Sequence, residues 1–238
     1  DGLKDHLWAA EFLNSKNLIG IFFVPALPYK NNQILDVHKA HLIIGKIKGK
    51  EVLDELKRYL LKRNFKNFFK YHDKIIFESA YSRNKDDNYR IEFKKIINYY
   101  GDIKLRHQVL DYLLKKFDIK INVNDYYLSK NEIKYISSLG MIIGSHCYSH
   151  TLLSRLSYNQ QYNEIKKSKI FLEKIIKKKI ETFCYPFGGK LSFDDNTVKI
   201  LKKLNFKASY SRDSRDIIKR DLKENLFELP RYDCNEFN

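Results

Sequence analysis

The 238-residue sequence is poor in cysteine and proline and has no long hydrophobic run. Its three cysteines, Cys147, Cys184 and Cys234, cannot all pair with one another and include no Cys-x-x-Cys unit. A disulfide framework and a zinc ribbon are therefore disfavoured, and we expect reduced, partly buried thiols. No apolar stretch approaches the roughly 20 residues that a membrane-spanning helix needs, and no export signal is visible. We expect a cytoplasmic or envelope-associated protein without a transmembrane segment.

Positive charge is abundant but not clustered. Lysine and arginine number 45 against 29 aspartates and glutamates, which gives a formal net charge of +16. Such an excess would attract nucleic acid or an anionic surface. The lysines recur, however, along segments such as 46–70 and 164–179, where they would occupy the solvated faces of amphipathic helices. We therefore expect no nucleic-acid partner, and a basic nucleic-acid-binding protein is the least favoured function.

The hydrophobic pattern predicts alternating helices and strands, interrupted by a long helical middle. Residues 3–17 have the spacing of a helix, and the apolar run 18–24 that follows is typical of a buried strand. From 29 to 124 the pattern is mainly helical. Beyond residue 128, short helices alternate with strands expected at 141–146, 181–186, 206–211 and 226–231. Such alternation indicates parallel β/α units, which place functional residues at the carboxyl ends of their strands.

Two helix starts carry capping boxes, in which a serine is followed three residues later by Glu or Gln. These are Ser129 with Glu132, and Ser157 with Gln160. Gly140 is expected to end the first of the two helices and to deliver the chain into the strand at 141–146.

Two histidines lie where that strand ends. His146 and His150 are four residues apart in "GSHCYSH". On spacing alone, a structural or solvent-facing role is favoured. A metal site is the alternative, because two neutral imidazoles and a carboxylate leave positions open on zinc where a water can be activated. His38 and His41 are spaced less suggestively, and we interpret them as one face of a helix, with the lining of a substrate entrance as the lesser alternative.

The segment "FCYPFGGK", residues 183–190, is a strand that runs into a Pro-Phe-Gly-Gly turn. Pro186 fixes φ, while Gly188 and Gly189 allow backbone conformations closed to other residues. The simplest interpretation is a βα turn. A functional interpretation adds that a backbone N–H in this turn could point at a developing oxyanion.

Taken in order, "DG" at the start, "HCYSH" and "CYPFGG" resemble the motifs of the polysaccharide deacetylase family, carbohydrate esterase family 4. The resemblance covers residues 1–25 and 128–233. It implies an α/β fold, a distorted and incomplete (β/α) barrel, with residues 1–238 as a single deacetylase-like domain and 29–125 as a helical insertion within it. The implied reaction is metal-dependent hydrolysis of N-acetyl groups on aminosugars. The implied substrate is a bacterial surface or cell-envelope glycan, of the type encoded with lipopolysaccharide genes.

The resemblance also implies roles for single residues. Asp1, His146 and His150 correspond to the ligands of a divalent metal, for which zinc is expected. The backbone N–H of Phe187 falls where the family donates a hydrogen bond to the oxyanion, and Tyr185 and Pro186 would shape the acetyl pocket.

Departures from the family pattern weaken the expectation of activity. The family's general base is the aspartate before "DG", and the chain begins one residue too late to contain it, so we expect an incomplete N-terminus. Cys184 replaces the arginine of the third motif, and no histidine follows His150 to act as the late general acid. Arg231 and Asp233 are the nearest late polar residues at a strand end, and we expect them to orient or neutralise the substrate. A catalytically impaired relative that only binds glycan is therefore the alternative.

Overall fold

The computed structural model describes residues 1–63, 80–81 and 85–233, and the chain divides into two compact units. Residues 1–33 and 122–238 form the first, which we call the sheet unit, and residues 34–121 form the second, the helical unit. Cys234 and the predicted helical residues 64–70 lie outside the described residues. The assignment of residues 29–125 as an insertion within a single domain stays a prediction.

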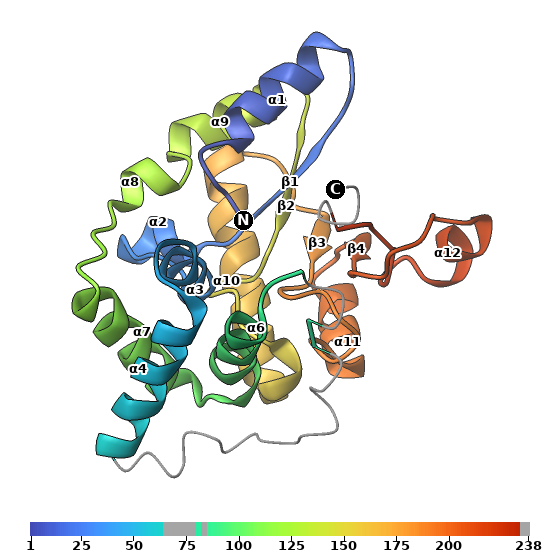
Figure 1. Cartoon of the computed structure of the whole chain (residues 1–238). Coiled ribbons are helices and arrows are strands. Elements are labelled where there is room, and N and C mark those ends of the chain that lie inside the picture. Colours follow the sequence, from blue (N-terminus) through green and yellow to red (C-terminus); the bar gives the residue numbers. More distant parts are fainter. Residues whose placement is uncertain (64–79, 82–84, 234–238) are drawn as a thin grey trace. The chain divides into compact units, whose positions relative to one another are not determined.

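A parallel four-stranded sheet lies at the centre of the sheet unit (Figure 1). In both spatial and chain order its strands are β1 (Ile21–Val24), β2 (Ile142–Ser145), β3 (Thr182–Cys184) and β4 (Ala208–Tyr210). Ile21 is in register with Ile142, and Thr182 with Ala208. Since β1 and β4 are its two edges, the sheet is open. The predicted α/β class with parallel strands is confirmed.

The strand predicted at 226–231 is shorter than expected. It is reduced to a parallel bridge between Leu229 and Tyr210, in which Leu229 N–H donates to the Ser209 carbonyl at 2.9 Å. Pro230 follows at once and has no N–H with which to continue the ladder. The apolar pattern therefore predicted the position of this segment but overstated its length.

The helices of the sheet unit begin where the capping signals predicted. Both capping boxes are present, at the start of α9 (Lys130–Ser138) and of α10 (Tyr158–Ile176). Gly140, with φ +84°, follows α9 as expected. The other helical elements are α1 (His6–Ser15), α2 (Leu27–Asn31), α8 (Val123–Tyr126), a 3₁₀ turn (Leu153–Arg155), α11 (Asp195–Lys203) and α12 (Lys219–Glu224).

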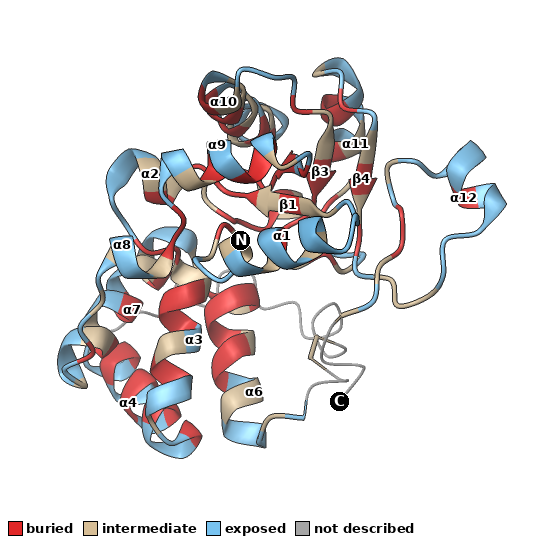
Figure 2. Ribbon diagram, turned by 90° about the horizontal axis from the view of Figure 1, so that it is seen from above, coloured by how far each residue is buried: buried red, intermediate tan, exposed pale blue. Residues whose placement is uncertain are grey.

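One hydrophobic core joins the strands to the helices of this unit. Phe22, Ile143 and Phe183 project from three strands and belong to the same buried cluster as Leu172 of α10 and Ile200 of α11. The buried faces of these elements are red in Figure 2. Burying one such side chain stabilises a fold by about 1.5–3 kcal/mol, so this layer fixes the strand ends to which polar residues are attached.

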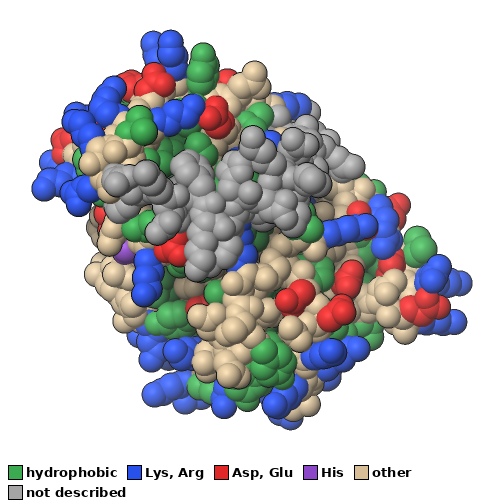
Figure 3. Space-filling model, turned by 90° about the horizontal axis from the view of Figure 1, so that it is seen from below, with side chains coloured by type: hydrophobic (Ala, Val, Ile, Leu, Met, Phe, Trp, Pro, Cys, Tyr) green, Lys and Arg blue, Asp and Glu red, His purple; other side chains and the backbone are tan. Residues whose placement is uncertain are grey.

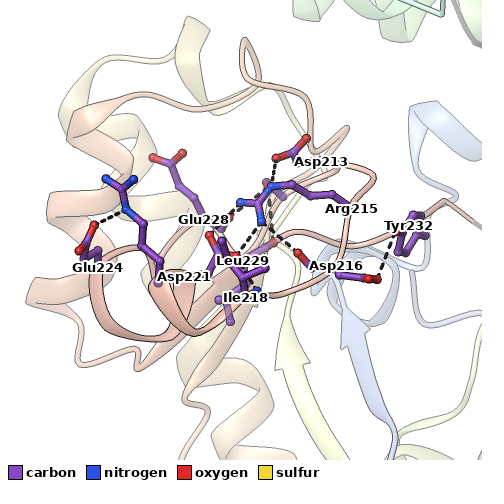
Figure 4. A network of polar contacts seen from close by, with 11 residues as sticks. Asp213, Arg215, Asp216, Ile218, Asp221, Glu224, Glu228, Leu229 and Tyr232 are labelled. Atoms are coloured by element: carbon purple, nitrogen blue, oxygen red, sulfur yellow. Dashed lines mark hydrogen bonds and ion pairs between the residues drawn. The ribbon is translucent and has the colours of Figure 1, made fainter.

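The segment between β4 and Leu229 is organised by polar contacts around Arg215 (Figure 4). The two Nη atoms of Arg215 donate to the carboxylate of Asp221 at 2.7 and 2.8 Å, and its Nε donates to Asp213 at 2.9 Å. Asp221 is buried, and this bidentate pair lowers the pKa of its carboxyl. Ile218 and Leu222, in contrast, remain exposed at α12.

The helical unit has a core of its own. It contains α3 (Asp36–Lys46), α4 (Gly49–Lys62), α6 (Asn88–Lys95), a π-helical turn (Ile96–Tyr100) and α7 (Ile103–Lys116). Ile43, Leu56, Phe93 and Leu110 are among its buried residues. The described part of this unit contains no strand, in agreement with the helical pattern of the sequence.

An ionic cluster links α3 to α7 within the helical unit. Asp36 accepts hydrogen bonds from Arg106 Nε at 3.2 Å and from His107 Nδ1 at 2.9 Å, and Lys39 lies 3.6 Å from it. Burial opposes ionisation of Asp36, but the three cations together lower its pKa. The hydrogen bond between His107 and Asp36 also raises the pKa of the His107 imidazole. His38 and His41 also lie in α3, with ring centroids 6.4 Å apart.

The structure shows where the basic side chains and two of the three cysteines lie. On the face shown in Figure 3, Lys and Arg side chains are dispersed among acidic and apolar ones. Cys147 and Cys184 are both buried and free, as expected for reduced thiols. Over the residues described, none of the helices combines the length and apolar character needed to cross a bilayer.

Candidate metal centre

Asp1, His146 and His150 lie together at the carboxyl end of the sheet. One ligand atom from each of the three residues lies within 4.8 Å of the other two. His146 Nε2 is 3.0 Å from Asp1 Oδ1, and His150 Nε2 is 3.6 Å from the same oxygen. Both imidazoles are buried, whereas the Asp1 side chain is 36% exposed. The cluster is therefore enclosed on the protein side and open on one side to solvent.

The elements that position these residues follow from the parallel sheet. His146 is the first residue after β2, and its N–H donates to the Val24 carbonyl of β1 at 3.2 Å. The Asp1 amino group donates to the Phe23 carbonyl, also in β1, at 2.8 Å. Because both ligand-bearing segments bond to the same strand end, the sheet brings together residues that are 145 positions apart in the sequence.

The hydrogen bond of His146 sets the direction of its second nitrogen. Nδ1 lies 2.7 Å from the carbonyl oxygen of Cys184. A carbonyl oxygen can only accept, so Nδ1 carries the proton and, in the neutral ring, Nε2 keeps its lone pair. That lone pair faces a carboxylate oxygen, so two acceptors point at each other. A cation bound by both groups would remove this repulsion, and a main-chain partner on the distal nitrogen is typical of metal-ligating histidines. The donor set therefore fits a divalent metal.

Three residues beside the cluster have left-handed backbone conformations although none is glycine. They are Cys147, His150 and Phe187, with φ of 63°, 54° and 65°. Each such conformation costs on the order of 1–3 kcal/mol and persists only where the surroundings determine it, most often at functional sites. The loop 146–150 and the turn after β3 thus adopt conformations that their own residues do not favour.

Glu164 of α10 is one of the groups that fix the loop 146–150, and it is not among the residues predicted from the sequence. Its carboxylate accepts a hydrogen bond from the Ser149 N–H at 2.8 Å. Burial raises the pKa of Glu164, while the hydrogen bonds from the 148–149 backbone oppose that rise. The linear pattern did not indicate this role, because Gln161 and Ser168, the buried residues on either side of Glu164 at helical spacing, are themselves polar. An acidic residue within the buried stripe of a helix needs a partner.

The Pro-Phe-Gly-Gly turn lies against the same cluster. The Phe187 ring packs on the His150 ring with centroids 5.1 Å apart, and Pro186 is buried. Gly188 has φ +70°, and a Cβ there would lie 3.0 Å from Arg212 N and 3.3 Å from Arg231 Nη2. Only glycine fits this position without strain. The turn is therefore tightly determined beside the residue predicted to donate to an oxyanion.

Tyr185 and Pro186, the two residues predicted to shape an acetyl pocket, are both buried but in different surroundings. The Tyr185 side chain is fully buried and stacks on Phe193, with ring centroids 3.7 Å apart. Its hydroxyl donates a hydrogen bond to the Phe227 carbonyl oxygen at 2.7 Å. Alternation along the strand turns this side chain into the core, and its assignment to the shaping of an acetyl pocket stays a prediction. Pro186 is also buried, but within the turn itself.

Arg231 and Asp233 behave differently from each other. The Arg231 guanidinium lies close to Gly188. Burial by itself raises the pKa of the Cys184 thiol, but interactions with His146 and the positive charge of Arg231 outweigh burial, so the pKa of this thiol is lowered. Asp233 lies 3.8 Å from Arg212, so the Asp233 carboxylate is near a neighbouring cation. Arg231 is therefore close to Cys184, beside the candidate centre, whereas the ion pair given for Asp233 is with Arg212.

The sheet and its cluster define an α/β protein with a candidate His-His-Asp metal centre at the carboxyl ends of parallel strands. The family model for polysaccharide deacetylases matches residues 108–209 of the chain, which include β2, β3 and both histidines. No curated protein matches the chain.

Several solved structures are similar to the chain. One is a polysaccharide deacetylase from Bacillus cereus, with 23% identity and a TM-score of 0.41 over 53% of this chain and 43% of that one. Another is the Streptococcus pyogenes deacetylase PplD in complex with acetate, with 17% identity and a TM-score of 0.42 over 90% and 91%. A third is a family 4 pseudoenzyme from Bacillus anthracis, with 24% identity and a TM-score of 0.32 over 40% and 34%. The chain spans less than half the length of the first and third.

Proposed function

We propose that the protein is a metal-dependent deacetylase that hydrolyses N-acetyl groups on aminosugars of a surface or cell-envelope glycan. The observation that carries the proposal is the convergence of Asp1, His146 and His150 within 4.8 Å at the strand ends. The match of residues 108–209 to the polysaccharide deacetylases supports the reaction class. Zinc suits two imidazoles and one carboxylate that leave positions open for water.

The residues around the centre would have separate roles, in binding the cation, in orienting His146 and in positioning His150. Asp1 Oδ1 and the two Nε2 atoms would hold the cation, and a bound divalent cation supplies Lewis-acid polarisation of a carbonyl and of water. The Cys184 carbonyl keeps His146 in the tautomer that a ligand requires. Glu164 would hold the 147–150 loop, in which Cys147 and His150 are left-handed, so that His150 faces the same point as His146.

The turn after β3 would supply the second requirement of amide hydrolysis, which is stabilisation of the oxyanion. Phe187 lies in this turn with its ring against His150. Its backbone N–H is the donor that we assign, because a main-chain donor in a rigid turn needs no reorganisation during the reaction. The Arg231 guanidinium beside Gly188 would add positive potential on the same side.

Metal content and acetate release test this proposal together. Purified protein equilibrated with zinc and then desalted should retain divalent metal by atomic emission spectrometry and release acetate from N-acetylglucosamine oligomers. His146→Ala should lose both, whereas His41→Asn, a histidine change in the helical unit, should lose neither. Metal retained equally by His146→Ala would remove the ligand assignment. Comparison of these oligomers with a lipid-linked glycan would define the substrate.

A glycan-binding relative without catalysis is the second candidate. Within the described residues the cluster contains a single carboxylate, Asp1, and that carboxylate is already assigned as a ligand. Hydrolysis also needs a group that takes the proton from water. Binding of N-acetylglucosamine oligomers that depends on metal, with no acetate released over long incubation, would favour this candidate. Any metal-dependent turnover would exclude it.

A further inference from the structure

The turns that lead into the strands form one surface, at the opposite end of the sheet from the candidate metal centre. Because all four strands are parallel, residues 16–20, 139–141, 177–181 and 204–207 precede them along a single edge. Neighbouring turns are joined by hydrogen bonds, from Ile142 N to Gly20 O at 2.9 Å and from Lys207 N to Glu181 O at 2.7 Å. We call this surface the amino edge.

The β1 side of the amino edge is apolar and exposed. Ile19 is 73% exposed and Leu18 is 53% exposed in the turn before β1. The outer face of α1 continues this surface, with Trp8 69% exposed and stacked on Phe12 at 5.6 Å. Lys16 lies over the Phe12 ring. Figure 2 shows α1 largely in the colours of exposed and intermediate residues. Four large apolar side chains within twelve residues indicate a surface that contacts something other than water.

The β3 and β4 side of the amino edge is basic. An open hollow of about 720 Å³ is lined by Lys169, Lys177, Lys178, Lys179 and Lys207. The two glutamates of this hollow already have partners, since Glu173 pairs with Lys169 and Glu181 with Lys207. The exposed run Lys177–Lys179 therefore carries an excess of three positive charges. Lys178 also donates to the Ser137 carbonyl, which joins this side to the end of α9.

We propose that the amino edge and the outer face of α1 bind peripherally to a membrane that contains anionic lipids. A soluble polyanion would engage the lysines but would gain nothing from Trp8, Phe12, Leu18 and Ile19. A bilayer interface offers a site for both groups, because headgroup phosphates attract lysine and the boundary with the acyl chains accommodates tryptophan and aliphatic side chains. In this orientation the carboxyl ends of the strands, with Asp1, His146 and His150, face away from the lipid.

Vesicle binding tests the proposal without reference to catalysis or metal. The full chain is mixed with vesicles of phosphatidylcholine alone, or of phosphatidylcholine with phosphatidylglycerol, and binding is measured by co-sedimentation. We expect binding to the anionic vesicles only. Trp8 is the single tryptophan of the sequence, so a blue shift of its emission on binding would place α1 at the interface.

Paired variants separate the two sides of the surface. Leu18→Ser with Ile19→Ser, and Lys178→Glu with Lys179→Glu, should each weaken vesicle binding by at least on the order of tenfold. The matched controls are Ile218→Ser with Leu222→Ser, and Lys219→Glu with Lys223→Glu, which change equally exposed residues at α12. These controls should bind as the parent does. All eight positions are exposed, and unchanged circular dichroism would show that the fold is kept.

Three outcomes would overturn the proposal. The first is the absence of binding to phosphatidylglycerol vesicles. The second is an equal loss of binding in the α12 controls, which would indicate attraction by net charge alone. The third is binding that is indifferent to Leu18→Ser with Ile19→Ser and is competed by a soluble polyanion such as heparin, which would identify the basic hollow as a polyanion site.

Discussion

Gly188 provides the most direct test of how the turn beside the candidate centre is built. Its φ of +70° is in the left-handed region, which costs a residue with a Cβ about 1–2 kcal/mol. The added methyl would also lie 2.9 Å from Arg212 Cβ and 3.0 Å from Arg212 N. Overlap with backbone cannot be relieved by a rotamer change, and overpacking of this kind costs about 1–3 kcal/mol. We therefore expect Gly188→Ala to lower the free energy of unfolding of the sheet unit by about 2–5 kcal/mol.

Urea denaturation followed by circular dichroism measures this change. With a slope of about 2 kcal/mol per molar urea, the midpoint should fall by about 1–2.5 M. Gly189→Ala is the matched control, because no atom lies within 4 Å of its Cβ position and its φ is not left-handed. At such a site, alanine is expected to be neutral or to stabilise by up to about 1 kcal/mol. Equal midpoints for the two variants would refute the account of this turn.

Three further changes test other parts of the structure. Glu164→Gln should weaken zinc binding by about 10–100-fold, measured by calorimetric titration, because it loosens the histidine loop without removing a ligand. His107→Gln should destabilise the helical unit near pH 6 but hardly near pH 9: a raised pKa in the folded state stabilises below the unfolded value of about 6.5, and this is lost as pH rises through the folded value. Urea midpoints at the two pH values measure the difference, and a pH-independent effect would contradict the role of its pair with Asp36. Tyr185→Phe should cost about 1–2 kcal/mol in unfolding free energy, because the hydrogen bond to the Phe227 carbonyl is lost, yet zinc affinity should not change; a large loss of zinc affinity would return Tyr185 to the site.

Local patterns predicted the elements well, because each is determined by residues close in sequence. The capping box at Ser129 and the glycine at 140 locate α9 without knowledge of any partner. The apolar run before Pro25 likewise marks β1, whose burial needs only a continuous hydrophobic segment. The strand at 226–231 was overestimated because the apolar pattern gave too little weight to Pro230.

The candidate site could be predicted only from the order of several motifs along the chain, because a linear sequence does not give the distances between residues. Spacing alone left His146 and His150 ambiguous, and it could not show that the Asp1 carboxylate lies 3.0 Å from an imidazole. Glu164 was missed because its role depends on the position of the Ser149 N–H in a loop fifteen residues earlier. The side chain of Tyr185 faces the core although the residue lies inside a motif, and its predicted role beside an acetyl pocket stays a prediction. Side-chain direction at a strand end depends on register and twist, which the linear pattern does not contain.

The partner of His146 Nδ1 is a main-chain carbonyl, that of Cys184, and this choice has a consequence for how the centre can vary. A carbonyl is present whatever side chain the residue carries, so this hydrogen bond to the imidazole depends on the alignment of β2 with β3. A different side chain at position 184, such as the arginine that the resemblance to polysaccharide deacetylases implies, would change the charge beside His146 without removing this acceptor. In the proposed site, the acceptor that orients a ligand and the charge beside that ligand would therefore be encoded separately, and each could change without the other.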